Sequence, residues 1–411
     1  MSGNAKWLFG SFVLMVGLFY FPGLLLYPFL TEAFQDYYNY QGSPYQSFLV
    51  VFPIYVLMLF FWVLLFSSFR GVAIPQVSYA VCSFFIWALL VLFMVCAFYF
   101  GAFYGSSFRH VNRLYGSGMM ANLVFLLKPV VCFLVLYAVL HVARGDRLGS
   151  RAKGAFFIIF LSLCFSITSS LQALAVAVVG LVLCSPKVFT WRLLRCNLKL
   201  LALSFVLLPA LLFVVLVVGV GNKIGYEVFF SQQGLVYVVD RGWALLSRIS
   251  SSLFSLATVF NLVLEGGFDY QYSERAIAYT ISNRFNAVFL GGFNADTIET
   301  VNRYNYELVF AGLADRAGAS PGPLSSMFYF PLFPMGFVLV PAIHALMASN
   351  ISRVMGGRLT GGVVSMVTVP FLIVMFFEAP INVFYIFDPF FFSLMAFFLM
   401  RILPIKDFLS R

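Results

Sequence analysis

The chain has 411 residues, of which 62% are hydrophobic and only 10% are charged, and its mean hydropathy is +0.97. An ordinary soluble domain carries about 25% charged residues, so this composition excludes both a soluble protein and a disordered one. It also excludes an outer-membrane barrel, whose strands show short alternating segments. We therefore expect an all-α polytopic membrane protein, and the formal net charge of +10 has to be interpreted from its distribution.

Apolar runs long enough to cross a bilayer recur along the chain, since a spanning helix requires about 20 mostly apolar residues. The qualifying runs are 7–30, 47–66, 78–104, 119–142, 200–220, 324–347, 360–377 and 383–402. A further run, 154–184, has a polar centre at 166–172, and we interpret it as a hairpin of two short helices, 154–167 and 171–184. This gives about ten transmembrane helices, arranged in three regions: 1–220, 221–323 and 324–411.

The distribution of positive charge supports the hairpin, because loops on the cytoplasmic side of a membrane are rich in Lys and Arg. With a hairpin at 154–184, 15 of the 25 basic residues fall on one side, accompanied only by Asp146 and Asp407. One long helix there would instead place Lys187, Arg192 and Arg195 on the outer side. We therefore expect both termini to be cytoplasmic, and the net charge indicates membrane orientation and no nucleic-acid partner.

The sequence gives no sign of a cofactor or a metal. None of the six Cys lies in the long outer loop, the three His are scattered, and there is no Walker motif or Gly-rich nucleotide loop. Acid pairs are able to hold a divalent cation, but no spacing of them in this chain calls for one. We expect neither a disulfide framework nor a nucleotide-driven pump.

The connection 221–323 is the most informative segment, because loops of roughly 100 residues are uncommon and usually functional. Six of its seven basic residues are Arg, whose planar fork suits carboxylates and phosphates. Residues 235–264 are apolar enough to form a helix that lies against or dips into the bilayer. A second helix is expected at 272–290, and the pairs Gly266-Gly267 and Gly291-Gly292 punctuate the two.

The arginines of this loop admit two interpretations. Arg241 and Arg248 are seven residues apart on the first helix, about 10 Å along its axis, and Ser252 continues that face. Either they meet lipid headgroups or Asp240, or they clamp a diphosphate, since charge in an apolar helix is costly unless it is used. On the second helix, Arg275 and Arg284 allow the same choice, with Glu274 as a simple ion-pair partner for one of them. Arg303 and Arg316 are expected to be solvated.

Other charges are expected at the edges of the apolar runs. Arg109, His110 and Arg113 form a basic cluster on the outer side, which suits either headgroup anchoring or help in gripping an anionic lipid. Lys128 lies inside an apolar run and either pairs with an acid or lines a cavity. His141 and His344 are expected to be structural.

This arrangement resembles the O-antigen polymerase (Wzy) family. The resemblance rests on ten or more spans, a helical hairpin with Ser-Ile-Thr-Ser-Ser at its tip (166–170), and a large outer loop with arginines. The segment Ile-Ser-Asn-Arg-Phe at 281–285 is similar to an isoleucine-Pro-Arg segment of the family, with Asn283 in place of Pro. Residues 319–323, followed by Tyr329 and Gly336, resemble the end of the family's loop, although Pro331 and Pro334 interrupt the helix that follows.

The resemblance implies a bacterial inner-membrane glycosyltransferase of the GT-C type that needs no metal and no nucleotide. It would join oligosaccharide repeat units carried on undecaprenyl diphosphate at the periplasmic face, alongside a polysaccharide chain-length regulator. The products would serve lipopolysaccharide or another polysaccharide. We expect Arg248 and Arg284 to stabilise the diphosphate leaving group.

Other groups complete this expected site. We expect Arg241 and Arg275 to assist in binding, and Asp269 and Glu274 to be candidates for the base that deprotonates the acceptor hydroxyl. The helix 235–264 would hold the polyprenyl tail. Several tyrosines could stack on sugar rings: Tyr270, Tyr272, Tyr279, Tyr304 and Tyr306.

Three alternatives remain at this point. An O-antigen ligase generally has a His in its large outer loop, and 221–323 contains none. A flippase or transporter of lipid-linked oligosaccharide needs charge along many spans, usually with short loops and internal repeats, whereas this chain concentrates its charge in one loop. A purely structural membrane anchor is the third alternative.

Overall fold

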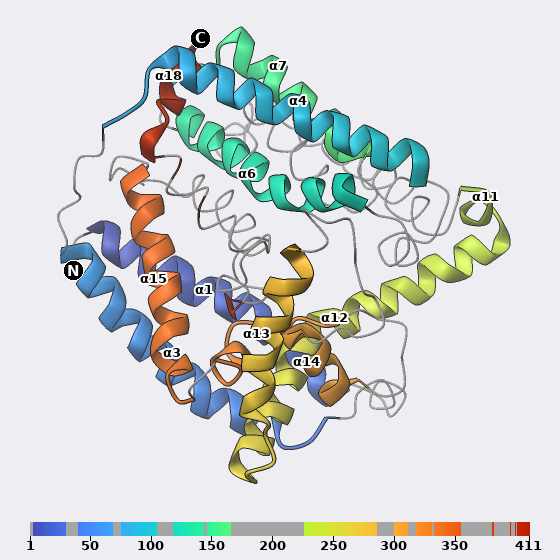
Figure 1. Cartoon of the computed structure of the whole chain (residues 1–411). Coiled ribbons are helices and arrows are strands. Elements are labelled where there is room, and N and C mark those ends of the chain that lie inside the picture. Colours follow the sequence, from blue (N-terminus) through green and yellow to red (C-terminus); the bar gives the residue numbers. More distant parts are fainter. Residues whose placement is uncertain are drawn as a thin grey trace, which may run out of the picture.

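The computed structural model describes residues 3–29, 40–68, 75–104, 118–143, 146–165, 226–285, 300–310, 318–330, 333–354 and 401–411, with the isolated residues 380, 381, 395 and 399. Over these residues the chain is mostly helical and has no β-strand (Figure 1). The elements are α1 (Gly3–Leu26), η1 (Tyr27–Phe29), α3 (Pro44–Ser68), α4 (Tyr79–Tyr104), α6 (Gly118–Ala143), α7 (Ser150–Phe165), α11 (Tyr226–Phe229), α12 (Gln232–Leu264), α13 (Tyr270–Phe285), α14 (Val301–Val309), η3 (Ser325–Met327), α15 (Gly336–Val354) and α18 (Ile405–Ser410).

Packing divides most of these helices into two groups. In the first group, α1 packs on α3 and α12, α15 packs on α3, and α12 also contacts α14 and η3. In the second, α4 packs on α6 and α7, and the short α18 contacts all three. Figure 1 shows the second group along one side of the molecule and the first group on the other.

Among the residues that the structure describes, two helices, α3 and α4, are long and apolar enough to cross a membrane. In α3, Val51, Tyr55 and Leu59 recur every four residues and are buried, while Leu57 on another face is 65% exposed. In α4, Phe84 is 77% exposed. Soluble proteins rarely present continuous apolar faces to water, so both helices are suited to apolar surroundings.

Helices occupy most of the expected apolar runs that the structure describes. α1, α3, α4 and α6 overlap the first four runs, and α7 matches the first half of the expected hairpin to within four residues. The second half of the hairpin, the runs 200–220 and 360–377, and most of 383–402 lie outside the described residues.

The helix expected from the apolar run 324–347 begins twelve residues later in the structure. Residues 324–330 form turns and η3, and the helix α15 starts only at Gly336. Pro334 lacks a backbone N–H and so cannot extend a helix backwards through this stretch. The N–H of Leu324 donates instead to the hydroxyl of Tyr20, at 3.0 Å. The apolar character of this segment thus serves packing, and it is not part of a continuous helix.

Both expected helices of the 221–323 connection are present. α12 runs three residues further towards the N-terminus than expected and ends at the predicted glycine pair, where Gly266 has a φ of +73°. α13 begins two residues earlier than expected, directly after Asp269. The stretch 286–299, which includes Gly291-Gly292, lies outside the described residues.

Candidate functional site

A buried polar junction joins the end of the 221–323 connection to the helices of the first group. Its centre is Asn305 on α14, a short helix whose first turn is capped by Thr300, which accepts a hydrogen bond from the N–H of Arg303 at 3.2 Å. Such a cap satisfies one of the four free N–H groups at a helix start. It fixes where α14 begins and therefore which face Asn305 occupies.

Asn305 uses both ends of its amide. Its Oδ1 accepts hydrogen bonds from the hydroxyl of Ser255 on α12 and from that of Tyr329, the latter at 2.9 Å. Its Nδ2 donates to the carbonyl oxygen of Ala319 at 3.1 Å. Because Asn305, Ser255 and Tyr329 are all buried, loss of the central amide would leave buried hydroxyls without this partner.

The N-terminal helix reaches the same junction. Tyr20 of α1 is fully buried, and its hydroxyl accepts from the N–H of Leu324. Next to it, Gly322 adopts a φ of +80°, and a Cβ added there would lie 2.9 Å from Cβ and Oγ of Ser252. The turn at residues 319–323 therefore requires glycine at this position, because the backbone passes directly over α12.

The half of α12 that enters this junction carries polar side chains inside an apolar core. Ser252, Ser255 and Thr258 follow one another at three-residue spacing and are all buried. Residues at this spacing share one helix face. Thr258 accepts from the N–H of Gln41 at 3.3 Å, so the row also fastens the segment between α1 and α3.

Asp269 starts α13 and holds Arg275. Its Oδ1 accepts from the N–H groups of Gln271 and Tyr272, at 3.0 and 3.2 Å, which is the geometry of a helix N-cap. Its Oδ2 lies 2.8 Å from Nη2 of Arg275, with both side chains about half exposed. These two predicted site residues are therefore brought together, and Asp269, not the neighbouring Glu274, is the partner of Arg275.

An aromatic stack lies against this ion pair. The rings of Tyr272 and Tyr304 stack with centroids 4.2 Å apart, and the guanidinium of Arg275 lies 5.6 Å from the centroid of Tyr272. The hydroxyl of Tyr304 accepts from the N–H of Asp269 at 3.3 Å. Burial raises the pKa of Tyr304 above its ordinary value, and it also raises that of Tyr270. The stack joins α13 to α14 and presents an arginine and a carboxylate beside aromatic rings.

Glu274 and Arg303 lie on α13 and α14, close in sequence to the pair of Asp269 and Arg275. The side chain of Glu274 is exposed and forms no ion pair with the described residues. Arg303 pairs with Glu307 through a 2.6 Å contact one helical turn away on α14. Arg303 is thus half-buried and engaged in a local helix pair, and it is not the solvated charge expected from the sequence.

For the other predicted arginines, the structure gives the backbone position on a helix and no side-chain contact. Arg241 and Arg248 lie on α12, and Arg284 is the penultimate residue of α13. Arg248 precedes Ser252 by four residues, so its backbone position is one turn before the buried polar row. The side chains of these three arginines lie outside the described part, as do Arg109, His110, Arg113 and Arg316 altogether.

The remaining polar residues named from the sequence form no hydrogen bond to Asn305 or its partners within the described ranges. The hydroxyl of Tyr55 on α3 and Nδ1 of His344 on α15 are 2.7 Å apart, both residues being buried, and Nδ1 of His141 lies 3.5 Å from Asp146. Both histidines join helices or helix ends, which agrees with their expected structural role. Lys128 lies within α6 and is half-buried. Across the described ranges, no three His, Cys, Asp or Glu side chains gather as a metal-ligand set.

Sequence reasoning missed the centre of the junction. Asn305, Ser255 and Tyr329 form one hydrogen-bonded unit, yet none of them was a candidate. The three-residue spacing of Ser252, Ser255 and Thr258 in an otherwise apolar helix was an available signal for a buried polar face. Nothing in the sequence near Asn305 indicated its role, because its partners are 14 to 50 residues away.

Comparisons with protein-family models, with curated proteins and with solved structures gave no match to this chain.

Proposed function

We propose that the chain is a polysaccharide polymerase of the inner membrane. In this proposal it joins oligosaccharide repeat units carried on undecaprenyl diphosphate, working at the periplasmic face without a metal or nucleotide. The glycan on one carrier is transferred to a sugar of a second lipid-linked unit, and the first carrier leaves as its diphosphate. The arginines of 221–323 stabilise that leaving group.

The observation that carries the proposal is the position of Arg248 on α12. The backbone of Arg248 lies one turn before a buried polar row whose Ser255 donates to Asn305 of α14, and Asn305 in turn accepts from Tyr329. Helix α1 packs on the same helix. Catalytic electrostatics require donors that are held in place before charge develops on the substrate. A helix anchored at one end in this way supports such placement better than a free loop does.

Arg284 is the second catalytic candidate, and it lies on a helix that is also anchored. α13 is capped by Asp269 and is joined to α14 through the stack of Tyr272 on Tyr304. Arg241 and Arg275 then contribute to binding the diphosphate or the sugars. Departure of the diphosphate places negative charge on its bridging oxygen, and guanidiniums donate to such an oxygen without needing a proton transfer.

In this proposal Asp269 and Glu274 have different roles. Asp269 already accepts two backbone hydrogen bonds and one from Arg275, so we assign it to positioning Arg275. Glu274 is exposed and forms no ion pair within the described ranges, which leaves its carboxylate available to take the proton of the acceptor hydroxyl. Glu274 is therefore the preferred base.

The membrane arrangement belongs to the same proposal. About ten spans, cytoplasmic termini and a periplasmic 221–323 follow from the distribution of Lys and Arg, and the apolar faces of α3 and α4 support the membrane location. Partners in this scheme are membrane lipid, two lipid-linked oligosaccharides and a chain-length regulator.

A genetic experiment tests the proposal in the cell. Deletion of the gene should leave surface glycan with a single repeat unit, and Arg248→Ala or Arg284→Ala should reproduce that pattern. Arg303→Ala, which removes a paired arginine of α14, is the matched control and should restore the full ladder of chain lengths. Full-length banding in the deletion strain would exclude a polymerase. Accumulation of complete but untransferred polymer would instead identify a ligase.

A further inference from the structure

The exposed face of α13 carries three neighbouring hydrogen-bonding side chains. Gln271, Glu274 and Arg275 are all exposed, and spacings of three and four residues place Glu274 and Arg275 next to Gln271 on the helix surface. Ala276, in contrast, is fully buried on the face that packs inward. The exposed face therefore offers an amide, a carboxylate and a guanidinium within about one helical turn.

Arg275 is held in place without a ligand. Its Nη2 donates to Oδ2 of Asp269 at 2.8 Å, and Asp269 is itself fixed by the N–H groups of Gln271 and Tyr272. The guanidinium also lies over the ring of Tyr272, which stacks on Tyr304. Among the described residues Arg275 forms no other hydrogen bond, although its side chain is 54% exposed. The rest of its fork of N–H groups is therefore available to a ligand.

Arg275 and Arg284 occupy opposite faces of α13. Nine residues separate them, which is about two and a half turns. Around the helix axis, Glu274 lies between them, about 100° from Arg275 and about 80° from Arg284. The proposed base therefore lies between the arginine assigned to the leaving group and the face that carries Gln271 and Arg275.

We propose that Gln271, Glu274 and Arg275 bind one sugar of the acceptor repeat unit, an inference that rests on the polymerase function proposed above. Gln271 and Arg275 donate to hydroxyls of this sugar and orient it, and Glu274 accepts the proton of the hydroxyl that reacts. The oxygen of that hydroxyl bonds to the anomeric carbon of the donor glycan. The bond from that carbon to the diphosphate breaks, and its electron pair leaves with the diphosphate. Arg275 thus serves the acceptor and not the diphosphate, and Gln271 determines acceptor specificity.

A sugar suits this face because each hydroxyl both donates and accepts hydrogen bonds. Glu274 only accepts, Arg275 only donates and the amide of Gln271 does both, so neighbouring hydroxyls of one ring find partners of each kind. A diphosphate at the same place would offer acceptors alone and would be repelled by the carboxylates of Asp269 and Glu274.

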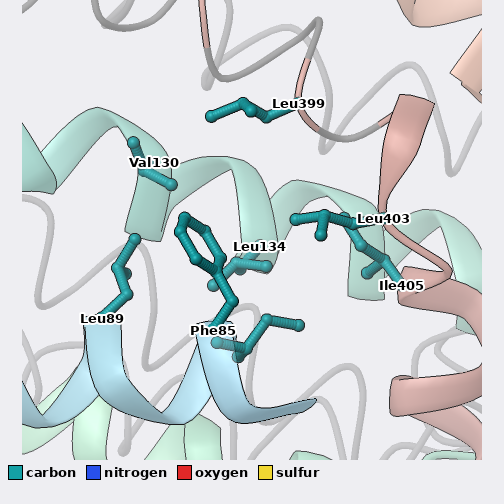
Figure 2. Close-up of a pocket in the computed structure, with 8 residues that line it drawn as sticks. Phe85, Leu89, Val130, Leu134, Leu399, Leu403 and Ile405 are labelled. Carbon is teal, nitrogen blue, oxygen red and sulfur yellow. The ribbon is translucent and has the colours of Figure 1, made fainter. Parts of the chain in front are cut away.

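A gap elsewhere in the described part of the chain is unsuited to a glycan. It lies between α4, α6 and the segment that leads into α18, and every side chain that lines it is apolar. Figure 2 shows Phe85 and Leu89 of α4 facing Val130 and Leu134 of α6. Sugar hydroxyls there would lose their hydrogen bonds to water without replacement, which is costly. The polar face of α13 has the partners that this gap lacks.

The experiment separates the acceptor from the donor. The acceptor probe is the repeat-unit oligosaccharide as a radiolabelled octyl glycoside, which has no diphosphate and therefore cannot act as a donor. The purified full chain receives this probe with a lipid-linked donor unit, and transfer onto the label is measured against the concentration of each substrate. Gln271→Ala should raise the KM of the octyl glycoside about fivefold and Arg275→Gln about 10- to 100-fold, the losses typical of one hydrogen bond from a neutral and from a charged donor. In both variants kcat and the KM of the donor should change less than twofold.

A control and a binding measurement make the outcome decisive. Gln46→Ala removes an exposed glutamine at the start of α3 and should leave every kinetic constant within twofold. Calorimetry of the octyl glycoside with the chain, without donor, should show the same losses in affinity for the Gln271 and Arg275 variants. Gln271→Ala removes an exposed side chain and should fold normally, so it decides the question if Arg275→Gln unfolds.

Two kinds of failure are distinguishable. An unchanged acceptor KM in Gln271→Ala, or a change confined to the donor, overturns the acceptor site, while joined product leaves the polymerase reaction standing. Absence of octyl glycoside binding by the unaltered chain also overturns the site. Binding that depends on Gln271 in a chain that joins no repeat units supports the site and contradicts the reaction instead.

Discussion

The hydroxyl of Tyr329 donates to Oδ1 of Asn305 across 2.9 Å, and this buried contact fastens the segment before α15 to α14. The same oxygen accepts from Ser255 of α12, and the amide nitrogen donates to Ala319. One asparagine therefore ties three separate stretches of chain together: α12, α14 and residues 318–330. The arginine-bearing helix α12 owes its fixed position at this end to a side-chain amide and not to apolar packing alone.

Removal of that amide should be costly. Asn305→Ala leaves the hydroxyls of Ser255 and Tyr329 and the carbonyl of Ala319 without this partner, and each buried polar group left unsatisfied costs about 1–3 kcal/mol. We expect a loss of unfolding free energy of at least about 2 kcal/mol, measured by denaturant unfolding in detergent micelles. Tyr329→Phe removes a single hydrogen bond and should cost about 1 kcal/mol. An equal or larger effect of Tyr329→Phe would contradict the central place of Asn305.

A comparison of alanine variants at Gly322 and Gly266 distinguishes the cost of a steric clash from the cost of a left-handed backbone. Both have positive φ, at +80° and +73°, but a Cβ at Gly322 meets Ser252 and Tyr20 within 3.0 Å whereas a Cβ at Gly266 meets nothing within 4 Å. Gly266→Ala should cost about 1 kcal/mol for the left-handed conformation alone. Gly322→Ala should cost clearly more in the same unfolding experiment. Similar losses in the two variants would mean that α12 and the 319–323 turn are not in close contact.

Asp269 is expected to act through its cap and not through proton transfer. Asp269→Ala removes the cap of α13 and should lower the unfolding free energy by about 1 kcal/mol, since the exposed pair with Arg275 adds little. Asp269→Asn keeps an acceptor for the backbone N–H groups and should cost less. The turnover number of the Asp269→Asn variant should stay within about tenfold of that of the unaltered chain. The Glu274→Gln variant should lose about 100-fold or more in turnover number. A complete loss of turnover in Asp269→Asn, with stability retained, would assign the base to Asp269.

Titration of Tyr304 should lower the free energy of unfolding as the pH rises above 10. Burial raises its pKa in the folded chain above the ordinary value of 10.0, so the unfolded chain loses this proton first. The stabilising contribution is complete below pH 10 and is lost as the pH rises above it towards the higher pKa of the folded state. Tyr304→Phe should therefore lose less stability than the unaltered chain when the pH is raised from 8 to 11. Parallel pH profiles of the two proteins would show that Tyr304 does not titrate differently on folding.

The sequence predicted the helices better than the contacts between them. Long apolar runs and the Gly266-Gly267 pair were sufficient for α3, α4, α12 and the start of α13, because these signals are local. The start of α15 was predicted wrongly because hydropathy continues through Pro334 whereas the backbone hydrogen bonds do not. Asp269 and Arg275 were both candidates, but their pairing was not foreseen. The Asn305 junction joins residues far apart in the sequence, and no local pattern encodes such contacts.

The most direct test of the central claim is polymerisation by the purified chain, supplied with synthetic lipid-linked repeat units in metal-free buffer. The account predicts products of two or more repeats and release of undecaprenyl diphosphate. It also predicts a loss of about 100- to 1000-fold in turnover for Arg248→Ala and Arg284→Ala, with Arg303→Ala close to the unaltered chain. Unchanged turnover in both arginine variants, or no joined product from a correctly folded preparation of the unaltered chain, would contradict it.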